Sequence, residues 1–206
     1  MTAGGICYLV GAGDFFGNIS AAQGDFIIAA DGGYESLLAR GVLPDLLLGD
    51  FDSIKEMPSG IETVRYPVEK DETDMFLAYK IGVSLGYKKF RIYGGVGGRE
   101  DHTFANYSLL LQAKRDENDA VLIGNGVEIK VIENEKTEIF GASGKCVSVF
   151  AIASDAEGVN IKGLKYEAEN ITLGCAFPLG VSNSFTDAGR GEISVARGAL
   201  LIFTEV

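Results

Sequence analysis

The feature that most constrains the fold is an alternation, over the first 125 residues, of short apolar runs with segments of helical spacing. The apolar runs are too short for helices and cover residues 5–13, 25–31, 44–50, 90–95 and 120–125. Between several of them, apolar side chains recur at helical intervals over residues 32–41, 72–86 and 102–117. This alternation predicts an α/β domain with a mainly parallel sheet that is buried on both faces and flanked by helices.

After about residue 126 the pattern changes to short alternating stretches separated by Gly, Asn and Asp. We expect strands at residues 127–133, 137–141, 146–153, 159–167 and 192–206. No segment here has convincing helical spacing, so an all-β domain is predicted, an antiparallel sandwich or a barrel. We place the border between domains 1–130 and 131–206, close to the polar stretch 132–137.

The composition limits the classes of partner. The chain has 206 residues, of which 47% are apolar, which is enough to bury a substantial core. Its net charge is −11, so it offers no basic face for nucleic acid, and an anionic substrate would need cations to bind. No apolar run approaches the length of a membrane helix and the N-terminus lacks a signal pattern, so we expect a cytoplasmic protein without membrane contact.

Cysteine and histidine are scarce and scattered. Cys7, Cys146 and Cys175 are far apart, which indicates reduced core thiols rather than a disulfide framework. His102 is the one histidine, so a zinc site has no ligand set and any metal would be held by oxygen.

Aspartates follow the expected strands at their carboxyl ends, where parallel sheets bind ligands. Asp31 follows one apolar run, and Asp50 and Asp52 follow another. In extended backbone Asp50 and Asp52 point the same way, about 6–7 Å apart, and their mutual repulsion favours a divalent cation between them. The alternative is an Asx-turn in which one Asp bonds the backbone.

A second acidic pair lies in "EKDETDMF". Asp71 and Asp74 are three residues apart at the expected start of a helix, which would place them on one face. They could complete a carboxylate cage for Mg²⁺, or Asp71 could be a helix N-cap with Asp74 in a capping box. Lys70 beside them could meet a phosphate as a point charge.

The stretch "GGVGGREDH", residues 94–102, joins an expected strand to an expected helix. Its glycines allow successive backbone N–H groups to face an anion, the helix offers its N-terminus, and Arg99 adds a fork of donors for phosphate oxygens. The alternative is a flexible connection in which Asp101 is the helix N-cap. His102 alone indicates little.

Two further clusters are less specific. "GAGDFFG" resembles a dinucleotide-binding glycine signature, but its third glycine, Gly17, is one place late and a poor helix former follows. In the second half, Gly180, Ser182 and Asn183 form a polar cluster between apolar residues that is equally consistent with a β-turn.

Taken in order, "ADGGYESLLARGVLPDLLLGDFDSI", "EKDETD", "GGVGGREDHTFAN" and "GVSN" resemble the thiamine pyrophosphokinases along the whole chain. The resemblance implies an α/β catalytic domain, a β-sandwich that helps bind thiamine, and a homodimer with active sites between subunits. It also implies transfer of pyrophosphate from ATP to the thiamine hydroxyl, with AMP released and Mg²⁺ required.

The resemblance assigns roles by position. It implies that Asp50, Asp52, Asp71 and Asp74 hold Mg²⁺. The expected ATP contacts are Asp31, Gly32, Gly33, Lys70, Gly95, Gly98, Arg99 and His102. The expected thiamine contacts are Gly180, Ser182 and Asn183.

The resemblance defines the catalytic residues and the aromatic residue that would contact the thiamine ring less closely. Arg99 would stabilise charge, and Asp71 or Asp101 would polarise the attacking hydroxyl. Because the chain has no tryptophan, Phe185 or a tyrosine would contact the thiamine ring.

Three rival functions use the same residues. One is a pyrophosphokinase acting on a hydroxymethyl pterin, and another is a Mg²⁺-dependent nucleotide hydrolase in which water replaces the alcohol. The third is a nucleotide sensor without turnover. The second domain with its G-x-S-N motif favours thiamine, since the acceptor would be selected there.

Overall fold

The structure is a computed structural model, and it describes residues 4–49, 60–66 and 71–206. The chain divides into two compact units, residues 1–125 and 126–206. The sequence placed this border between residues 130 and 131, a position inside strand β7 (Val127–Glu133).

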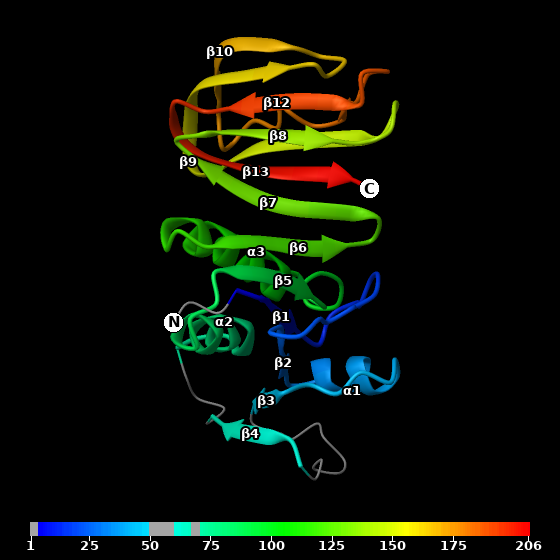
Figure 1. Ribbon diagram of the computed structural model, residues 1–206. Helices are drawn as coiled ribbons and strands as arrows, with labels where there is room; N and C mark the ends of the chain where they lie inside the picture. The colour runs from blue at the N-terminus through cyan, green and yellow to red at the C-terminus, as the bar shows by residue number, and fades with distance from the viewer. Residues whose placement is uncertain (1–3, 50–59, 67–70) are drawn as a thin grey trace. The chain divides into compact units, whose positions relative to one another are not determined.

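Unit 1 is an α/β unit in which the described strand pairs are parallel. Its elements in chain order are β1 (Ile6–Val10), β2 (Phe26–Ala30), α1 (Gly33–Leu38), β3 (Leu46–Gly49), β4 (Glu62–Arg65), α2 (Asp74–Ser84), β5 (Lys89–Tyr93), α3 (Glu100–Arg115) and β6 (Asp119–Gly124). The strand order is β4-β3-β2-β1-β5-β6, which can be followed in Figure 1. The five strands and three helices expected from the sequence are therefore present.

Both faces of this sheet are buried, as its apolar runs predicted. On one face Tyr8 and Val10 pack with Tyr34 and Leu37 of α1. The opposite face meets α2, where a Cβ on Gly82 would touch Phe90 and Cys7. Strand β4 was not predicted, because its exposed ETVR sequence contains no apolar run.

Unit 2 is built from antiparallel strands. They are β7, β8 (Lys136–Phe140), β9 (Cys146–Lys162), β10 (Ala168–Leu173), β11 (Asn183–Ser184), β12 (Arg190–Ser194) and β13 (Arg197–Glu205). The first half of β9 pairs with β13 and its second half with β10 and β12 (Figure 1). The interior residues of unit 2 form one hydrophobic core, which includes Val149, Ile161 and Ile202.

The fold prediction is confirmed in part. Strands 146–153 and 159–167 were expected as separate elements, but β9 is continuous from Cys146 to Lys162. Parallel pairing is confined to unit 1, for which it was predicted, so the strands of the whole chain are mixed rather than mainly parallel. The physical reason is the connections: long crossovers such as the one through α3 return the chain in the same direction in unit 1, whereas short turns such as the one between β9 and β10 reverse it in unit 2.

The cysteines are free thiols, but they do not share one environment. Cys7 is buried, as predicted, whereas Cys146 and Cys175 are exposed, so the prediction of three core thiols is wrong for two of them. Among the helices of the described ranges, none combines the length and the apolar character that crossing a membrane requires.

A half-buried carboxylate, Asp25, binds the backbone at the start of β1 and predicts acid sensitivity. Asp25 Oδ1 accepts from the Ile6 N–H at 2.7 Å, and Oδ2 accepts from the Ala22 N–H at 2.8 Å. Hydrogen bonds from the Ala22 and Ile6 amides lower the pKa of Asp25, so its contribution to stability is present above its unfolded pKa and is lost as the pH falls. We expect Asp25→Asn to lower the melting temperature at pH 7 and to flatten its decline below about pH 4.

The measurement is thermal unfolding followed by circular dichroism from pH 3 to pH 7. Glu35→Gln on the exposed surface of α1 is the control for the loss of one negative charge. An unchanged pH profile in Asp25→Asn would contradict the assignment.

Candidate active site

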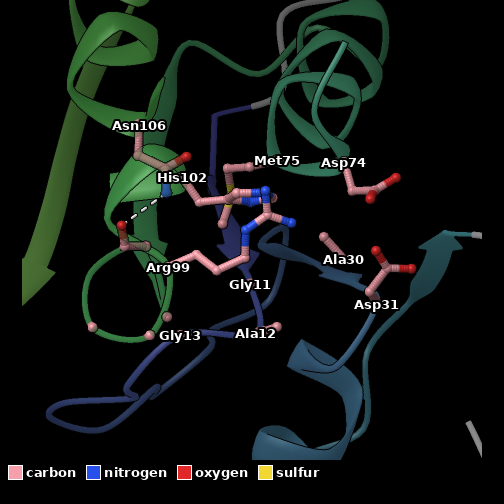
Figure 2. Close-up of a pocket in the computed structure, with 14 residues that line it drawn as sticks. Gly11, Ala12, Gly13, Ala30, Asp31, Asp74, Met75, Arg99, His102 and Asn106 are labelled. Atoms are coloured by element: carbon pink, nitrogen blue, oxygen red, sulfur yellow. Dashed lines mark hydrogen bonds between the residues drawn. The ribbon is translucent and has the colours of Figure 1, made fainter. Parts of the chain in front are cut away.

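A cavity of about 380 Å³ opens at the carboxyl edge of the unit 1 sheet. It is bounded by the loop after β1, the end of β2, the start of α2, and the loop from β5 into α3 (Figure 2). The lining residues are Gly11, Ala12, Gly13, Ala30, Asp31, Asp74, Met75, Gly94, Gly95, Gly97, Gly98, Arg99, His102 and Asn106. Among the predicted site residues, the structure therefore brings together Asp31, Asp74, Gly95, Gly98, Arg99 and His102.

Two glycine-rich loops form the floor by bonding to each other through the backbone. The Gly11 N–H donates to the Tyr93 carbonyl at 2.9 Å, and the Gly13 N–H donates to the Gly94 carbonyl at 2.9 Å. A Cβ on Gly94 would overlap the Gly11 carbonyl, so side chains have no room where the loops meet. The cavity therefore presents bare backbone, which allows a close approach of phosphate oxygens.

The dinucleotide-binding alternative is not supported by this arrangement. In that motif a helix follows the first strand directly. Here residues 11–25 contain no helix, and the next elements after β1 are β2 and then α1. The first glycine loop instead packs against the second one.

Helix α3 points its N-terminus at the cavity. Its N-cap is Arg99, with φ −78° and ψ 121°, and the Arg99 side chain makes no capping hydrogen bond. The alternative with Asp101 as N-cap is wrong, because Asp101 is the second residue of the helix. The loop is anchored by Asn106, which is 6% exposed and donates from Nδ2 to the Gly95 carbonyl at 2.8 Å (Figure 2).

Arg99 is held by its neighbour Asp101 in a two-point contact. Arg99 Nε donates to Asp101 Oδ1 at 3.1 Å and Nη2 donates to Oδ2 at 2.6 Å. The hydrogen bonds from Arg99 lower the pKa of the Asp101 carboxyl, and the bond to Asp101 raises the pKa of Arg99. Arg99 is therefore a permanent cation in the pocket wall, and Asp101 is a weak base.

Two carboxylates line another part of the cavity. Asp31 ends β2 in a left-handed conformation, with φ 46°, and its N–H donates to the Leu48 carbonyl at 2.9 Å. Asp74 is the first residue of α2 and lines the same cavity as Asp31 (Figure 2). Gly32 and Gly33 follow Asp31 into α1, where a Cβ on Gly33 would overlap the Val10 carbonyl.

The expected capping box at α2 is wrong. The N-cap is Thr73, whose hydroxyl oxygen accepts from the Phe76 N–H at 3.2 Å. Asp71 lies before the helix and is exposed, so it does not share a helical face with Asp74. Threonine is itself a good cap, so the capping hydrogen bond of α2 does not depend on Asp71.

Asp50, Asp52 and Lys70 lie outside the described residues. Within residues 4–49, 60–66 and 71–206, no three His, Cys, Asp or Glu side chains gather closely enough to hold a metal ion. Asp31 and Asp74, which line the same cavity, offer the hard oxygen donors that suit Mg²⁺, so the residues present fit part of a magnesium site.

In unit 2 the predicted cluster has mixed roles. Asn183 is 6% exposed, and its Oδ1 accepts from the Tyr166 and Ser184 N–H groups, both at 2.9 Å. Its Nδ2 donates to the Tyr166 carbonyl at 2.7 Å. Ser182 is exposed in a left-handed conformation with φ 61°, and its N–H donates to Ser148 Oγ at 3.1 Å.

The neighbours of this cluster are structural. The Gly180 carbonyl accepts from the Val149 N–H at 2.9 Å, and a Cβ at Gly180 would overlap the Val149 carbonyl. Phe185 is 2% exposed in the unit 2 core, so the expectation that it contacts a ring ligand is wrong. The exposed aromatic beside Asn183 is Tyr166, whose residue is 60% exposed.

Sequence reasoning gave no role to Met75 or Asn106. Asn106 follows His102 by four residues, so helical spacing could have placed both on the face that meets the cavity. Met75 resembles an ordinary core residue of α2 in its pattern, and nothing in the sequence distinguishes it.

Fold and pocket together define a class of protein: an α/β unit with a glycine-lined cavity at the carboxyl edge of its sheet, followed by an all-β unit. Residues 20–122 match the family model described as thiamin pyrophosphokinase, catalytic domain. Residues 127–200 match the model described as thiamin pyrophosphokinase, vitamin B1 binding domain. The chain belongs to the thiamin pyrophosphokinase family.

Individual relatives agree with this membership. A thiamine pyrophosphokinase of Bacillus subtilis is 30% identical over 182 residues, which cover 85% of this chain and 85% of the relative. A crystal structure of thiamine pyrophosphokinase from the same organism has a TM-score of 0.88 at 24% identity and covers 98% of this chain and 99% of that one. The yeast thiamin pyrophosphokinase structure shares the fold with a TM-score of 0.75 at 15% identity, covering 98% of this chain and 86% of its own.

The anchor beneath the glycine loop can be tested through Asn106. Asn106→Leu keeps the volume but removes the donor to the Gly95 carbonyl, so we expect the free energy of unfolding to fall by about 1–3 kcal/mol. We also expect weaker ATP binding, because the loop loses its fixed conformation. Ser108→Ala, on the exposed side of the same helix, should change stability by less than about 0.5 kcal/mol.

Urea denaturation and calorimetric titration with ATP provide the two measurements. Equal stability in Asn106→Leu and Ser108→Ala would show that the bond to Gly95 contributes nothing.

Proposed function

We propose that this protein transfers the pyrophosphoryl group of ATP to the hydroxyl of thiamine, giving thiamine diphosphate and AMP. The observation that carries the proposal is the cavity of unit 1. Bare glycine backbone, the N-terminus of α3 and Arg99 converge there beside the Asp74 carboxylate. These are donors for a polyphosphate and an oxygen ligand for its metal, within a family of pyrophosphokinases.

ATP phosphates would lie against the second glycine loop. Gly95, Gly98 and Arg99 would contact the phosphate oxygens, with His102 one turn further along α3. Asp31, Gly32 and Gly33 would shape the opposite wall, and Lys70 would add a second cation. The net charge of −11 makes these local donors necessary, because the molecule as a whole repels a polyanion.

Magnesium belongs to this proposal through its ligands. Asp50, Asp52, Asp71 and Asp74 would hold it, and Asp74 is the one of them that lines the described cavity. When bound, Mg²⁺ would offset the negative charge of the phosphate oxygens.

The reaction needs alignment more than covalent help. A bond forms between the thiamine hydroxyl oxygen and the β-phosphorus, and the bond from that phosphorus to the oxygen bridging to the α-phosphate breaks. AMP leaves with the bridging oxygen, and the hydroxyl proton is released. Arg99 would stabilise charge on the transferred group, and Asp71 would polarise the hydroxyl.

Thiamine selection is proposed for unit 2. The Ser182 hydroxyl is exposed at the surface of the unit, close in sequence to Gly180 and Asn183. Tyr166 replaces Phe185 as the candidate aromatic contact for the thiamine ring, because Tyr166 is exposed. Asn183 binds both the N–H and the carbonyl of Tyr166 and so holds its backbone in place. A flat aromatic ring of thiamine could pack on the Tyr166 ring.

The rival functions are less well supported. A pterin pyrophosphokinase or a nucleotide hydrolase would use the same unit 1 cavity, but neither explains the match of residues 127–200 to a vitamin B1 binding domain. A sensor without turnover does not agree with membership in an enzyme family.

We further propose a cytoplasmic homodimer with active sites at the subunit interface. Sedimentation equilibrium would test the dimer, because it measures the mass of the particle.

The activity is tested by incubating the protein with Mg²⁺ and ATP, with and without thiamine. We expect thiamine diphosphate and AMP in equal amounts, and only when thiamine is present, as measured by chromatography with mass detection. AMP or ADP formed without thiamine would establish a hydrolase instead. Turnover with a hydroxymethyl pterin, but not with thiamine, would establish the other rival.

Tyr166 provides a test of the acceptor site. We expect Tyr166→Ala to raise the KM for thiamine by about three- to tenfold, the worth of one aromatic contact, with the KM for ATP unchanged. Phe140→Ala is the matched control, since Phe140 is 64% exposed in the same unit. Equal effects of the two substitutions on thiamine would remove Tyr166 from the acceptor site.

A further inference from the structure

Arg99 is a flexible side chain that must act at a defined place. Its side chain is 72% exposed, and nothing in its own rotamers selects one direction. Holding an arginine in a single geometry costs side-chain entropy, and a fixed contact formed before the ligand arrives removes that cost from binding. The question is therefore what fixes Arg99.

Asp101 holds one edge of the guanidinium. The Nε and one Nη2 hydrogen point to the two carboxylate oxygens, at 3.1 and 2.6 Å. Asp101 Oδ1 also accepts from the His102 N–H at 3.0 Å, so the carboxylate is itself tied to the first turn of α3. Arginine has five donors, so two serve this pair and three remain for another partner.

Arg99 and Asp101 differ in their position relative to the cavity. Arg99 and His102 line the cavity, whereas Asp101 is not among the described residues that do. Asp101 therefore contacts Arg99 without lining the cavity itself. Both of its oxygens are engaged by donors of Arg99, which leaves it poorly suited to receive a proton.

We propose that Asp101 is a positioning residue, which fixes the Arg99 guanidinium so that its remaining N–H groups face the phosphates of ATP. This inference rests on the proposed function, since it names the role of a residue in that site. It replaces the expectation that Asp101 polarises the attacking hydroxyl. The lowered pKa of Asp101 supports it, because a weaker base is less useful for proton transfer.

Charge and positioning predict opposite effects of Asp101→Asn. Removing a negative charge beside an anion site would tighten ATP binding if charge alone mattered. Positioning predicts weaker binding, because the neutral amide holds the guanidinium less firmly. We expect the Kd and the KM for ATP to rise by about five- to tenfold, with the KM for thiamine unchanged.

The decisive experiment is a double-mutant cycle of Arg99→Ala and Asp101→Asn. If Asp101 acts through Arg99, Asp101→Asn costs nothing further in the Arg99→Ala protein, so the double variant matches Arg99→Ala within about twofold. Calorimetric titration with Mg²⁺ and ATP gives the binding readout, and steady-state kinetics gives kcat and KM separately. Asp101→Glu should recover part of the loss, because it restores a carboxylate.

The control is a second arginine–aspartate pair of the same unit. Arg91 Nη1 contacts Asp119 Oδ2 at 3.2 Å, and neither residue lines the cavity. Asp119→Asn removes the same charge in the same way and should leave ATP binding unchanged.

Three results would overturn the inference. Tighter ATP binding by Asp101→Asn would show that the carboxylate competes with phosphate for Arg99. A full loss from Asp101→Asn in the Arg99→Ala background would show that it acts by itself. Disappearance of the acidic limb of the kcat–pH profile in Asp101→Asn would make it a base. Failure of the unmodified protein to bind ATP at all would instead refute the proposed function.

Discussion

The active-site region depends on one backbone contact, in which the loop after β1 bonds to the loop after β5. These strands are parallel neighbours, so their carboxyl ends meet and the two loops are forced together. Gly11 and Gly13 donate to carbonyls at the end of β5, and side chains at the contact would collide with backbone. The result is a cavity with walls of peptide groups, and the residues with chemistry, Arg99 and Asp74, enter it from two helix starts.

This construction explains how an acidic protein can hold an acidic substrate. Peptide N–H groups and the N-terminus of α3 carry partial positive charge, which the net charge of the protein does not include. Arg99 adds a full positive charge at this site. Its pairing with Asp101 brings the summed charge of the two side chains near zero, while the remaining N–H groups of Arg99 still face the cavity. Attraction at such a site is short-ranged, because screening by salt removes interactions beyond about 10 Å.

The sequence predicted the elements of unit 1 better than their ends. Buried strands can be recognised in the sequence as apolar runs. The exposed strand β4 has the sequence ETVR, which is not such a run, and it was therefore missed. At α2, Thr73 and Asp71 are both acceptable caps, and only the folded chain shows which hydroxyl or carboxylate meets the Phe76 amide. At α3, the pairing of Asp101 with Arg99 depends on side-chain geometry that spacing does not encode.

The G-x-S-N motif shows the same limit more sharply. Ser182 and Asn183 are adjacent polar residues with equal capacity to bind a ligand, yet Asn183 is buried and pairs with the backbone of Tyr166 as a neighbouring strand would. Its contribution is to hold a loop that exposes an aromatic ring. A motif residue can therefore be required for a site without touching the ligand, because the burial of its amide is stable only when its hydrogen bonds are made within the protein. For this protein, the residue that contacts thiamine is better sought among exposed residues that such motif residues hold in place, as Asn183 holds Tyr166, than among the residues of the motif.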